Sequence, residues 1–381
     1  MSGVPRRLTL LYWGRRGALS RLALELARAA ATMPNLQATF SVSRQNDLFA
    51  DFEALGTSLL PVTTFESSFG AVAGVHRLPA LRRALADHLA QHQTDTVVAL
   101  MPHVWSQLLI DTVRDAGARY VTIVHDAVHH PGDRSGRLHR WLRREARLAD
   151  HVITLSRAVA TQLTHQWDLP ADRLSTSFLP DICYGEAAPL PLDAPASPAA
   201  PLRLLFFGRL LSYKGLPRLI DAVAQLRQGG VPIALSVCGD GDIRLLRARL
   251  DAIGAEVVNR WIGEPEVAAL FRRCHAVVLS HSEASQSGVA AVALGAGVPV
   301  VAVPVGGIVE QIRHEDTGLL AAEATSAALA DTLRALATSP ALHQRLRDGI
   351  ARSAPQRSVT RFLSDLSLLV ERAEPAGART A

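Results

Sequence analysis

The sequence predicts an α/β protein with two domains, each built on an open parallel sheet. Three observations support this prediction: the length of 381 residues, an alternation of short apolar runs with amphipathic stretches, and a proline-rich segment near the middle. One hydrophobic core rarely organises so long a chain. Apolar runs that alternate with amphipathic stretches are typical of βαβ units. Ligands of open parallel sheets bind beyond the carboxyl ends of the strands, so we expect the site in a cleft between the domains.

The first domain, residues 1–185, contains continuous apolar runs that are typical of parallel strands buried on both faces. A helical stretch follows the first of these runs. The expected strands are Leu8–Trp13, Thr96–Met101, Tyr120–His125 and Val152–Leu155, and the expected helix is Leu19–Ala30.

A linker is expected at residues 186–201, where five prolines alternate with small residues and favour a semi-extended chain. The alternation restarts in the second domain, residues 202–355. Apolar residues at helical spacing then predict a C-terminal helix within residues 356–374, which packs on either domain or crosses back to the first. The strands expected in the second domain are Leu202–Phe207, Ile233–Val237, Val257–Ile262, Ala276–Ser280 and Pro299–Val303, and the helices are Leu216–Arg227, Ile243–Ala252, Pro265–Arg273, Gly288–Gly295 and one that starts near Ile308.

The composition is that of an ordinary globular protein, with 48% apolar and 20% charged residues. The formal net charge of +5 suits phosphate-bearing ligands or an anionic membrane. Zinc-finger spacing and RNA-binding aromatic motifs are not found, so we expect no nucleic-acid partner. The three cysteines, Cys183, Cys238 and Cys274, are widely spread, which argues against a disulfide framework and favours the cytoplasm.

One stretch, Ala284–Val309, carries no charged residue and is long enough for a membrane span. However, Pro299, Pro304 and the pair Gly306–Gly307 break it into helix, strand and turn. We therefore expect no membrane span here, and we expect a cytoplasmic protein for which peripheral attachment to the inner face of the membrane stays open.

The run Phe207–Leu210 ends an apolar strand in a glycine turn, and Lys214–Gly215 precedes a helix. Gly208 permits close approach of a ligand to the backbone, and Arg209 offers a bidentate fork for phosphate. Lys214 adds a compact positive charge near a helix N-terminus. The pattern suits a diphosphate, although a solvated loop is the alternative interpretation.

The segment His281–Val289 also joins the end of a strand to a helix. Ser287 and Gly288 would present backbone amides at that helix N-terminus, which favours an anion. Glu283 is a carboxylate in an otherwise uncharged region and suits two sugar hydroxyls. Its alternative role is to cap the helix.

Five segments occur in order at plausible spacing: FFGRLLSYKG, VCGDGD, SHSEASQSGV, GAGVPVVAVPVGGIVEQI and DTGLL. Together they resemble the C-terminal domain of the retaining family-four glycosyltransferases, over about residues 202–321. The resemblance implies a GT-B fold, with two Rossmann-like domains whose parallel sheets face a central cleft. It also implies that Arg209 and Lys214 hold the donor diphosphate, that Glu283 contacts the sugar, and that the amides of Gly288 and Val289 lie near the phosphates or the sugar.

The chain departs from the family pattern in one respect. Many members carry a second Glu about eight residues after the first, which typically holds the nucleotide ribose, whereas Gly288–Ala293 has no carboxylate. The form EASQSGV resembles a sub-group that has Gln-Ser-Gly-Val instead. The ribose contact is therefore left unassigned, and a degenerate, inactive member is an alternative.

The triplet Asp240–Asp242 resembles the metal-binding DxD of the other major glycosyltransferase fold. It lies in a strand-to-helix turn, where Asp and Gly serve turn and cap roles. Further ligands for a hard divalent cation are not evident nearby. Because Arg209 and Lys214 could neutralise the departing diphosphate, we expect neither a metal nor another cofactor.

The first domain offers a less specific loop, Gly14, Arg15, Arg16 and Gly17, between its first strand and helix. The resemblance places a glycine-rich loop facing the cleft at this point in many members. A plain strand-to-helix turn is the alternative. The loop is not a dinucleotide fingerprint, because the third glycine and the later ribose-binding acid are not evident.

His125 and Asp126 close another strand and are the catalytic candidates of this domain, together with Glu283 of the second. The family often has a His on this loop, which contacts the transferred sugar or helps to place the acceptor. A His there could also shuttle protons, with Asp126 orienting it or acting on the acceptor. His103 lies at another strand end, and His129–His130 are interpreted as a polar turn.

Basic and apolar residues interleave between Asp133 and Asp150, which predicts a basic amphipathic helix. One interpretation is a surface for anionic lipid that brings the acceptor side to a lipid-linked substrate. The other is a solvated helix face. The basic residues are Arg134, Arg137, His139, Arg140, Arg143, Arg144 and Arg147, and the apolar ones are Leu138, Trp141, Leu142 and Leu148.

The resemblance implies transfer of a glycosyl group from a nucleoside-diphosphate sugar to an acceptor hydroxyl, with retention of configuration. A saccharide or lipid-linked saccharide of the cell envelope is the expected acceptor. A sugar-nucleotide epimerase or a phosphorylase on the same fold is a second interpretation. A non-catalytic partner subunit that binds a sugar nucleotide is a third, supported by the missing second Glu.

Overall fold

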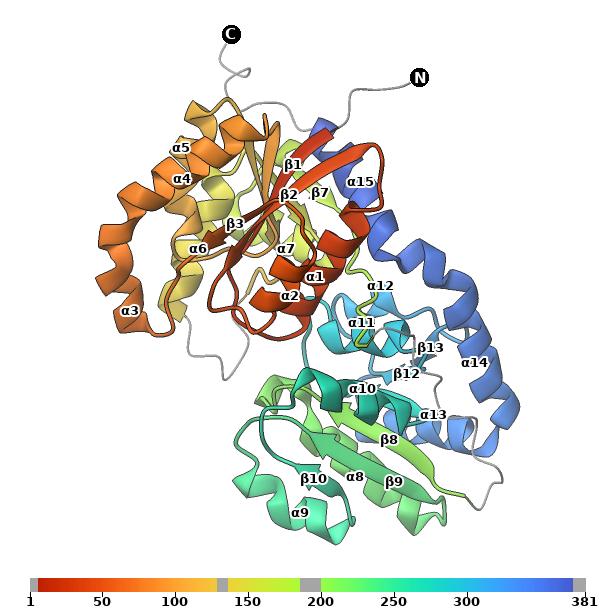
Figure 1. Ribbon diagram of the computed structural model, residues 1–381. Helices are drawn as coiled ribbons and strands as arrows, with labels where there is room; N and C mark the ends of the chain where they lie inside the picture. The colour runs from red at the N-terminus through yellow and green to blue at the C-terminus, as the bar shows by residue number, and fades with distance from the viewer. Residues whose placement is uncertain (1–5, 129–135, 186–199, 373–381) are drawn as a thin grey trace. The chain divides into compact units, whose positions relative to one another are not determined.

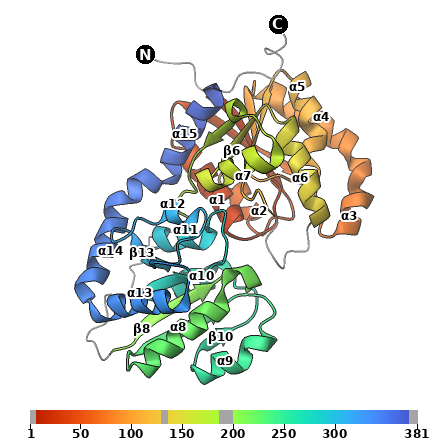
Figure 2. The ribbon, with the colours of Figure 1, turned by 180° about the vertical axis from the view of Figure 1, so that it is seen from behind.

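The computed structural model describes residues 6–128, 136–185 and 200–372, which form two compact units (Figure 1 and, from behind, Figure 2). The first unit contains the described residues up to Phe178 together with the C-terminal segment from Val359. The second contains the described residues from Leu179 to Ser358. Most of the expected linker, His129–His130 and the tail from Pro375 lie outside the described residues.

The first unit is built on a seven-stranded sheet in which every strand pair is parallel. The strand order is β3-β2-β1-β4-β5-β6-β7. Continuous apolar runs such as Val97–Ala99 are buried because helices cover the sheet. The strands are β1 (Arg6–Tyr12), β2 (Leu36–Ser43), β3 (Leu59–Val62), β4 (Thr96–Ala99), β5 (Arg119–Val124), β6 (His151–Thr154) and β7 (Leu174–Thr176).

The helices of the first unit include the C-terminal helix of the chain. This helix contacts α1, Glu371 forms an ion pair with Arg6, and the ring of Phe362 packs edge-on against Phe178 at 5.9 Å. The helices are α1 (Ala18–Ala30), α2 (Phe49–Ala54), α3 (Ser68–Ala73), α4 (Leu78–Gln91), α5 (Ile110–Asp115), α6 (Gly136–Leu148), α7 (Arg157–Trp167) and α15 (Val359–Arg372), with 3-10 turns η1 (Gly74–Arg77), η2 (Ser106–Leu109) and η3 (Ala171–Arg173).

The second unit has a six-stranded parallel sheet in the order β10-β9-β8-β11-β12-β13. Its strands are β8 (Leu202–Phe207), β9 (Ile233–Cys238), β10 (Glu256–Val258), β11 (Ala276–Leu279), β12 (Val300–Ala302) and β13 (Gly318–Leu320). Its helices are α8 (Leu216–Gln228), α9 (Arg247–Ala252), α10 (Glu264–Arg272), α11 (Gly288–Gly295), α12 (Ile308–Gln311), α13 (Ser326–Thr338) and α14 (Pro340–Ser353), with 3-10 turns η4 (Ser212–Lys214), η5 (Arg244–Leu246) and η6 (Ala354–Arg357).

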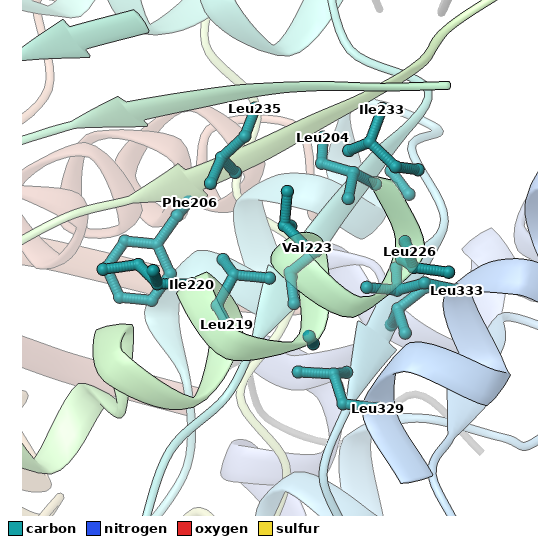
Figure 3. Close-up of a cluster of buried hydrophobic side chains, with 14 of the residues drawn as sticks. Leu204, Phe206, Leu219, Ile220, Val223, Leu226, Ile233, Leu235, Leu329 and Leu333 are labelled. Atoms are coloured by element: carbon teal, nitrogen blue, oxygen red, sulfur yellow. The ribbon is translucent and has the colours of Figure 1, made fainter. Parts of the chain in front are cut away.

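The core of the second unit lies between its sheet and the helices α8 and α13 (Figure 3). Phe206 of β8 packs toward Leu219 and Ile220 of α8. Leu329 of α13 belongs to the same cluster. The apolar residues of α8 recur at helical spacing, so one face of the helix is buried.

In each sheet the order in which successive strands are added reverses at one pair of neighbouring strands. In the first unit this pair is β1 and β4, and in the second it is β8 and β11. The loops that follow such a pair diverge, which leaves space for a ligand at the carboxyl ends of the strands. The predicted site residues of each unit lie at or beside these loops.

The predicted alternation of strands and helices is confirmed, with two corrections in the second unit. Ile243–Ala252 is a 3-10 turn followed by the short helix α9, and the strand expected at Val257–Ile262 covers only Glu256–Val258. That strand is short because β10 is an edge strand with β9 as its single neighbour. The uncharged stretch from Ala284 is divided among α11, β12 and a turn at Gly306, as expected. In the described parts of the chain, no helix combines the length and apolarity that a membrane span requires.

Candidate functional site

The turn after β8 holds Arg209 between two anchored neighbours. Gly208 has φ +106°, and its amide donates to Cys238 O at 3.0 Å. The amide of Leu210 donates to Asp240 O at 2.8 Å. Because the backbone on each side is fixed, the exposed side chain of Arg209 starts from a fixed Cα position.

The glycines of the segment after β9 allow this anchoring. A Cβ atom at Gly239 would overlap Gly208 O, and one at Gly241 would lie 2.6 Å from Leu210 O. The carboxylate of Asp242 accepts hydrogen bonds from Arg244, which lower the pKa of Asp242 to about 2. Within the described residues, no group of three or more His, Cys, Asp and Glu side chains is arranged to hold a metal ion. The hydrogen bonds of Asp240 O to Leu210 N and of Asp242 to Arg244 place both aspartates in a turn that supports the β8 loop.

The end of the β8 loop lies against the start of the loop after β11. Gly215 has φ +70°, and a Cβ atom there would overlap Ser280 O. The hydroxyl of Ser280 donates to the carbonyl oxygens of Lys214 and Gly215 at 3.1 and 2.9 Å. The amide of Ser282 donates to Tyr213 O at 2.8 Å, and Lys214 Nζ lies 5.6 Å from the centre of the Tyr213 ring. The two loops are thus joined by their backbones.

Arg218, in the first turn of α8, was not among the predicted site residues. Its Nη1 donates to Ser280 O at 2.5 Å and to His281 O at 2.8 Å. The guanidinium therefore fixes the strand end from which Glu283 follows. The sequence carries no local signal for this role, because an Arg in the first turn of a helix is usually exposed.

At the N-terminus of α11, the backbone amide of Ser287 has a different partner from the one expected. Ser287 caps the helix by accepting a hydrogen bond from Ala290 N at 3.2 Å. Its own amide, which was expected to face an anion, donates to Gln311 Oε1 at 2.7 Å, while Gln311 Nε2 donates to Ser287 O at 3.2 Å. The expectation for the Ser287 amide is therefore wrong, and Gly288 and Val289 supply the first-turn amides of this helix.

One contact places the N-terminus of α11 near the β8 turn, and another ties the residue after Glu283 to the loop after β12. A Cβ atom at Gly208 would lie 3.4 Å from Val289 Cγ2, so the turn and the helix start are in contact. Glu283 is half-buried and precedes Ala284, whose carbonyl accepts from Gly307 N at 3.0 Å. Because Ser287 is the N-cap, the alternative role of Glu283 as the cap is excluded.

In the first unit, His125 follows β5 and its Nε2 lies 2.7 Å from Leu100 O. A carbonyl only accepts, so Nε2 carries the proton and Nδ1 is left as the acceptor of the ring. Burial lowers the pKa of His125, while the hydrogen bond to Leu100 and the charge of Asp126 raise it. The net effect favours the neutral ring, and Asp126 beside it is exposed.

The loop of Gly14, Arg15, Arg16 and Gly17 lies at the same edge of that sheet. Asn46 Nδ2 donates to Gly14 O at 2.9 Å, and Asp47 N donates to Arg15 O at 2.8 Å. A Cβ atom at Gly14 would lie 3.1 Å from Met101 Cε and would overlap the hydroxyl of Tyr12. Gly17 has φ +98° and starts α1, and both arginines are exposed.

A buried polar network behind this edge was not predicted. Glu145 of α6 is fully buried and accepts from Ser106 Oγ at 2.5 Å, Tyr120 Oη at 2.8 Å and Thr122 Oγ1 at 3.3 Å. Burial raises the pKa of Glu145 to about 7 against the opposing effect of these hydrogen bonds. The network fixes α6 and the η2 turn, which follows His103.

His103 itself packs between aromatic rings. Its ring centre lies 5.5 Å from that of Trp13 and 5.0 Å from that of Phe65. Trp105 N donates to His103 Nδ1 at 3.2 Å, and burial lowers the pKa of His103 to about 4. This side chain is a neutral packing element at the edge of the site.

The structure brings the predicted residues together in two groups, one in each unit. Arg209, Lys214, Glu283, Gly288 and Val289 lie on the two joined loops of the second unit. The Gly14–Gly17 loop and His125 lie at the carboxyl edge of the first sheet. The residues that sequence reasoning missed are those that position others: Tyr12, Asn46, Glu145, Arg218, Ser280 and Gln311.

Two family models match the chain, one in each half. The model described as Glycosyltransferase Family 4 matches residues 19–176, and the model described as Glycosyl transferases group 1 matches residues 201–339. Each half of the chain is therefore similar in sequence to glycosyltransferases.

Curated relatives and solved structures agree with these matches. Glycogen synthase of Mycobacterium tuberculosis is 31% identical over 257 residues, which are 64% of this chain and 59% of the relative. A D-inositol 3-phosphate glycosyltransferase of Pseudarthrobacter chlorophenolicus is 37% identical over 146 residues, which are 36% of this chain and 35% of the relative. HepE of Anabaena, solved with UDP and glucose, superimposes with a TM-score of 0.68 at 18% identity, over 96% of this chain and 99% of that one.

The fold is that of the GT-B proteins, with one Rossmann-like parallel sheet in each of two units. The two halves of this fold are each similar in sequence to a family of glycosyltransferases.

Proposed function

We propose that the protein transfers a sugar from a nucleoside-diphosphate sugar to an acceptor hydroxyl. The observation that carries this proposal is the joining of two loops at the β8–β11 pair, one with Arg209 and Lys214 and the other leading into α11. Two cations beside helix N-terminal amides suit a diphosphate, and they stabilise the charge that develops as it departs.

The proposed chemistry needs no covalent intermediate on the protein. The bond between the anomeric carbon and the diphosphate oxygen breaks, and the acceptor oxygen bonds to that carbon. The proton of the acceptor hydroxyl passes to the departing diphosphate. Retention of configuration rests on the resemblance to family four, and no metal is needed because Arg209 and Lys214 neutralise the leaving group.

Glu283 and His125 have positional roles in this proposal. Glu283 accepts hydrogen bonds from sugar hydroxyls, and its backbone is set by the carbonyls that Arg218 holds two and three residues upstream. His125 is neutral and offers Nδ1 as an acceptor for a hydroxyl, because Nε2 donates to Leu100. Asp126 assists by its charge, and the exposed Arg15 and Arg16 add positive charge at the same sheet edge.

The relatives support a sugar-nucleotide donor. HepE has been solved with UDP and with UDP-glucose, and the relative from Pseudarthrobacter is a glycosyltransferase named for D-inositol 3-phosphate. For this chain we propose a saccharide or lipid-linked saccharide acceptor of the cell envelope. A cytoplasmic protein that attaches to the inner face of the membrane through basic α6 fits such an acceptor.

Transfer is tested by incubating the protein with UDP-, GDP- and ADP-sugars and candidate acceptors, and by reading the anomeric configuration of the product by NMR. We expect turnover that needs an acceptor, with retention. Conversion of the sugar nucleotide without an acceptor would indicate an epimerase, and nucleotide binding without turnover would indicate a partner subunit.

Arg209→Ala should lower kcat/KM about 100-fold or more without unfolding the protein, as removal of a charge-stabilising donor does elsewhere. Arg334→Ala is the matched control, because Arg334 is an exposed arginine of α13 that is ion-paired to Asp331. Unchanged turnover in Arg209→Ala would contradict the diphosphate role.

A further inference from the structure

Three of the large apolar side chains that are exposed lie close together in the first unit. Phe69, Val72 and Val75 are 82%, 74% and 48% exposed, and they belong to α3 and η1. A spacing of three residues puts them on one side of this short helical segment. We call these three side chains the α3 ridge.

The opposite side of the segment is firmly packed. Trp105 Nε1 donates to Ala71 O at 3.2 Å, and a Cβ atom at Gly74 would lie 2.7 Å from the Trp105 ring. Ser67 caps α3 by accepting from Gly70 N at 3.1 Å. The outward direction of the ridge therefore follows from how the segment is anchored.

The basic helix α6 is anchored by Val104, the residue that precedes Trp105 in the chain. Trp141 Nε1 donates to Val104 O at 2.8 Å, so Val104 holds α6 and Trp105 holds α3. The two helices are drawn side by side in Figures 1 and 2. The ridge is thus adjacent to α6.

The charge of the exposed face of α6 has one sign. Arg140 and Arg144 are exposed, and the Arg144 guanidinium lies 5.7 Å from the Trp141 ring centre. Glu145 is the single acidic residue of α6, and it is fully buried in the network with Ser106 and Tyr120. Because this carboxylate is buried, α6 exposes basic side chains but no acidic one.

An apolar ridge beside a cationic helix suits an anionic bilayer, into which apolar side chains insert while arginines face the headgroups. A protein partner fits less well. Three side chains provide less than the ~800 Å² that each partner of a standard protein interface buries.

We propose that the α3 ridge and the exposed arginines of α6 form one docking surface for an anionic lipid bilayer, with the ridge as the inserted part. This surface holds the first unit at the membrane, where a lipid-linked acceptor is presented. That last consequence rests on the proposed function, whereas binding to lipid does not.

The test is co-sedimentation of the full chain with vesicles, with neither nucleotide nor acceptor present. Vesicles of phosphatidylcholine alone are compared with vesicles that contain phosphatidylglycerol. We expect binding to the anionic vesicles only, weakened by salt. Phe69→Ser/Val72→Ser should lower the partition coefficient ~10-fold or more, and Arg140→Gln/Arg144→Gln should lower it and reduce its salt dependence.

The matched control is Leu245→Ser/Leu368→Ser, which removes two other exposed leucines, 95% and 52% exposed, and should leave binding unchanged. Circular dichroism should show all variants folded, because every substituted side chain is exposed. Wild-type protein that ignores anionic vesicles, or a ridge variant that binds like the wild type, would overturn the proposal. Self-association through the ridge without vesicle binding would point to a protein partner instead. Because the assay measures no transfer, failure here leaves the proposed activity separately testable.

Discussion

The carboxyl edges of the two sheets are held in different ways. In the second unit the loops meet backbone to backbone: Gly215 lies against Ser280, and Gly239 lies against Gly208. In the first unit Asn46 donates to Gly14 O, and a Cβ atom at Gly14 would meet the side chain of Tyr12. Side-chain hydrogen bonds support both edges, but only the glycines compared here from the second edge face backbone atoms.

This difference determines how each edge responds to substitution. A glycine at a backbone crossing tolerates no Cβ atom, so a single methyl group should disrupt the joined loops of the second unit. A buried polar network loses hydrogen bonds one at a time, and conservative replacements should retain part of its stability.

The largest expected effect is that of Gly215→Ala. The new Cβ atom would overlap Ser280 O, and φ is +70°. Gly230, beyond the other end of α8, has φ +75° with no atom within 4 Å of a Cβ and is the matched control. We expect Gly230→Ala to cost about 1–2 kcal/mol in free energy of unfolding and Gly215→Ala about 4 kcal/mol or more, measured in urea. Equal costs would contradict the backbone account.

The next effect tests the side-chain account of the first unit. Glu145→Ala removes the carboxyl that accepts from the buried hydroxyls of Tyr120 and Thr122 and should cost about 3 kcal/mol. Glu145→Gln keeps one acceptor oxygen and should cost less. Glu53→Ala, at an exposed position of α2, is the control and should change stability by about 0.5 kcal/mol or less. Thermal unfolding measures all three, and an Ala variant as stable as the control would sink this account.

The pH dependence of stability should also report on Glu145. Its pKa in the folded protein is raised to about 7 by burial, so the protonated carboxyl stabilises the fold. This contribution is fully present below the unfolded pKa of about 4.3 and is lost as pH rises through the folded pKa. The stability of the wild type relative to Glu145→Gln should therefore fall by about 3 kcal/mol between pH 4 and 8. A constant difference across that range would show that folding does not shift the pKa of Glu145.

A smaller effect is expected at Gln311, the one side chain that holds both backbone groups of Ser287. Gln311→Ala should loosen the start of α11 and weaken nucleotide-diphosphate binding by about tenfold, which corresponds to about 1.4 kcal/mol. Gln225→Ala, at an exposed position of α8, serves as the control. Calorimetric titration distinguishes the two, and identical affinities would remove Gln311 from the site.

The sequence predicted the second unit better than the first, and the reason is physical. Where two backbones approach closely, only glycine fits, and such a glycine can be recognised in a motif. Gly208, Gly215 and Gly239 all lie in the motifs FFGRLLSYKG and VCGDGD. The role of Gly306 was partly visible, because a glycine pair after a strand indicates a turn. Its contact with Ala284 required the fold.

Residues that act through distant partners left no such signal. Arg218 contacts carbonyls more than 60 positions away, and Glu145 meets Ser106 across 39 positions. The Ser287 amide was misassigned for the same reason, because Gln311 lies 24 positions along the chain. Loop and strand pairing over such separations follows from the strand order, which the sequence pattern did not specify.

The central claim is that the joined loops of the second unit bind a nucleoside diphosphate. The most direct measurement is calorimetric titration with UDP, GDP, ADP and CDP of the wild type and of Arg209→Ala/Lys214→Ala. Arg334→Ala/Arg345→Ala, which removes two exposed cations from α13 and α14, is the charge-matched control. The account predicts selective binding of one nucleotide by the wild type and the control, with about 100-fold weaker binding by the loop variant. Equal affinity in all three proteins, or no binding by folded wild type, would contradict it.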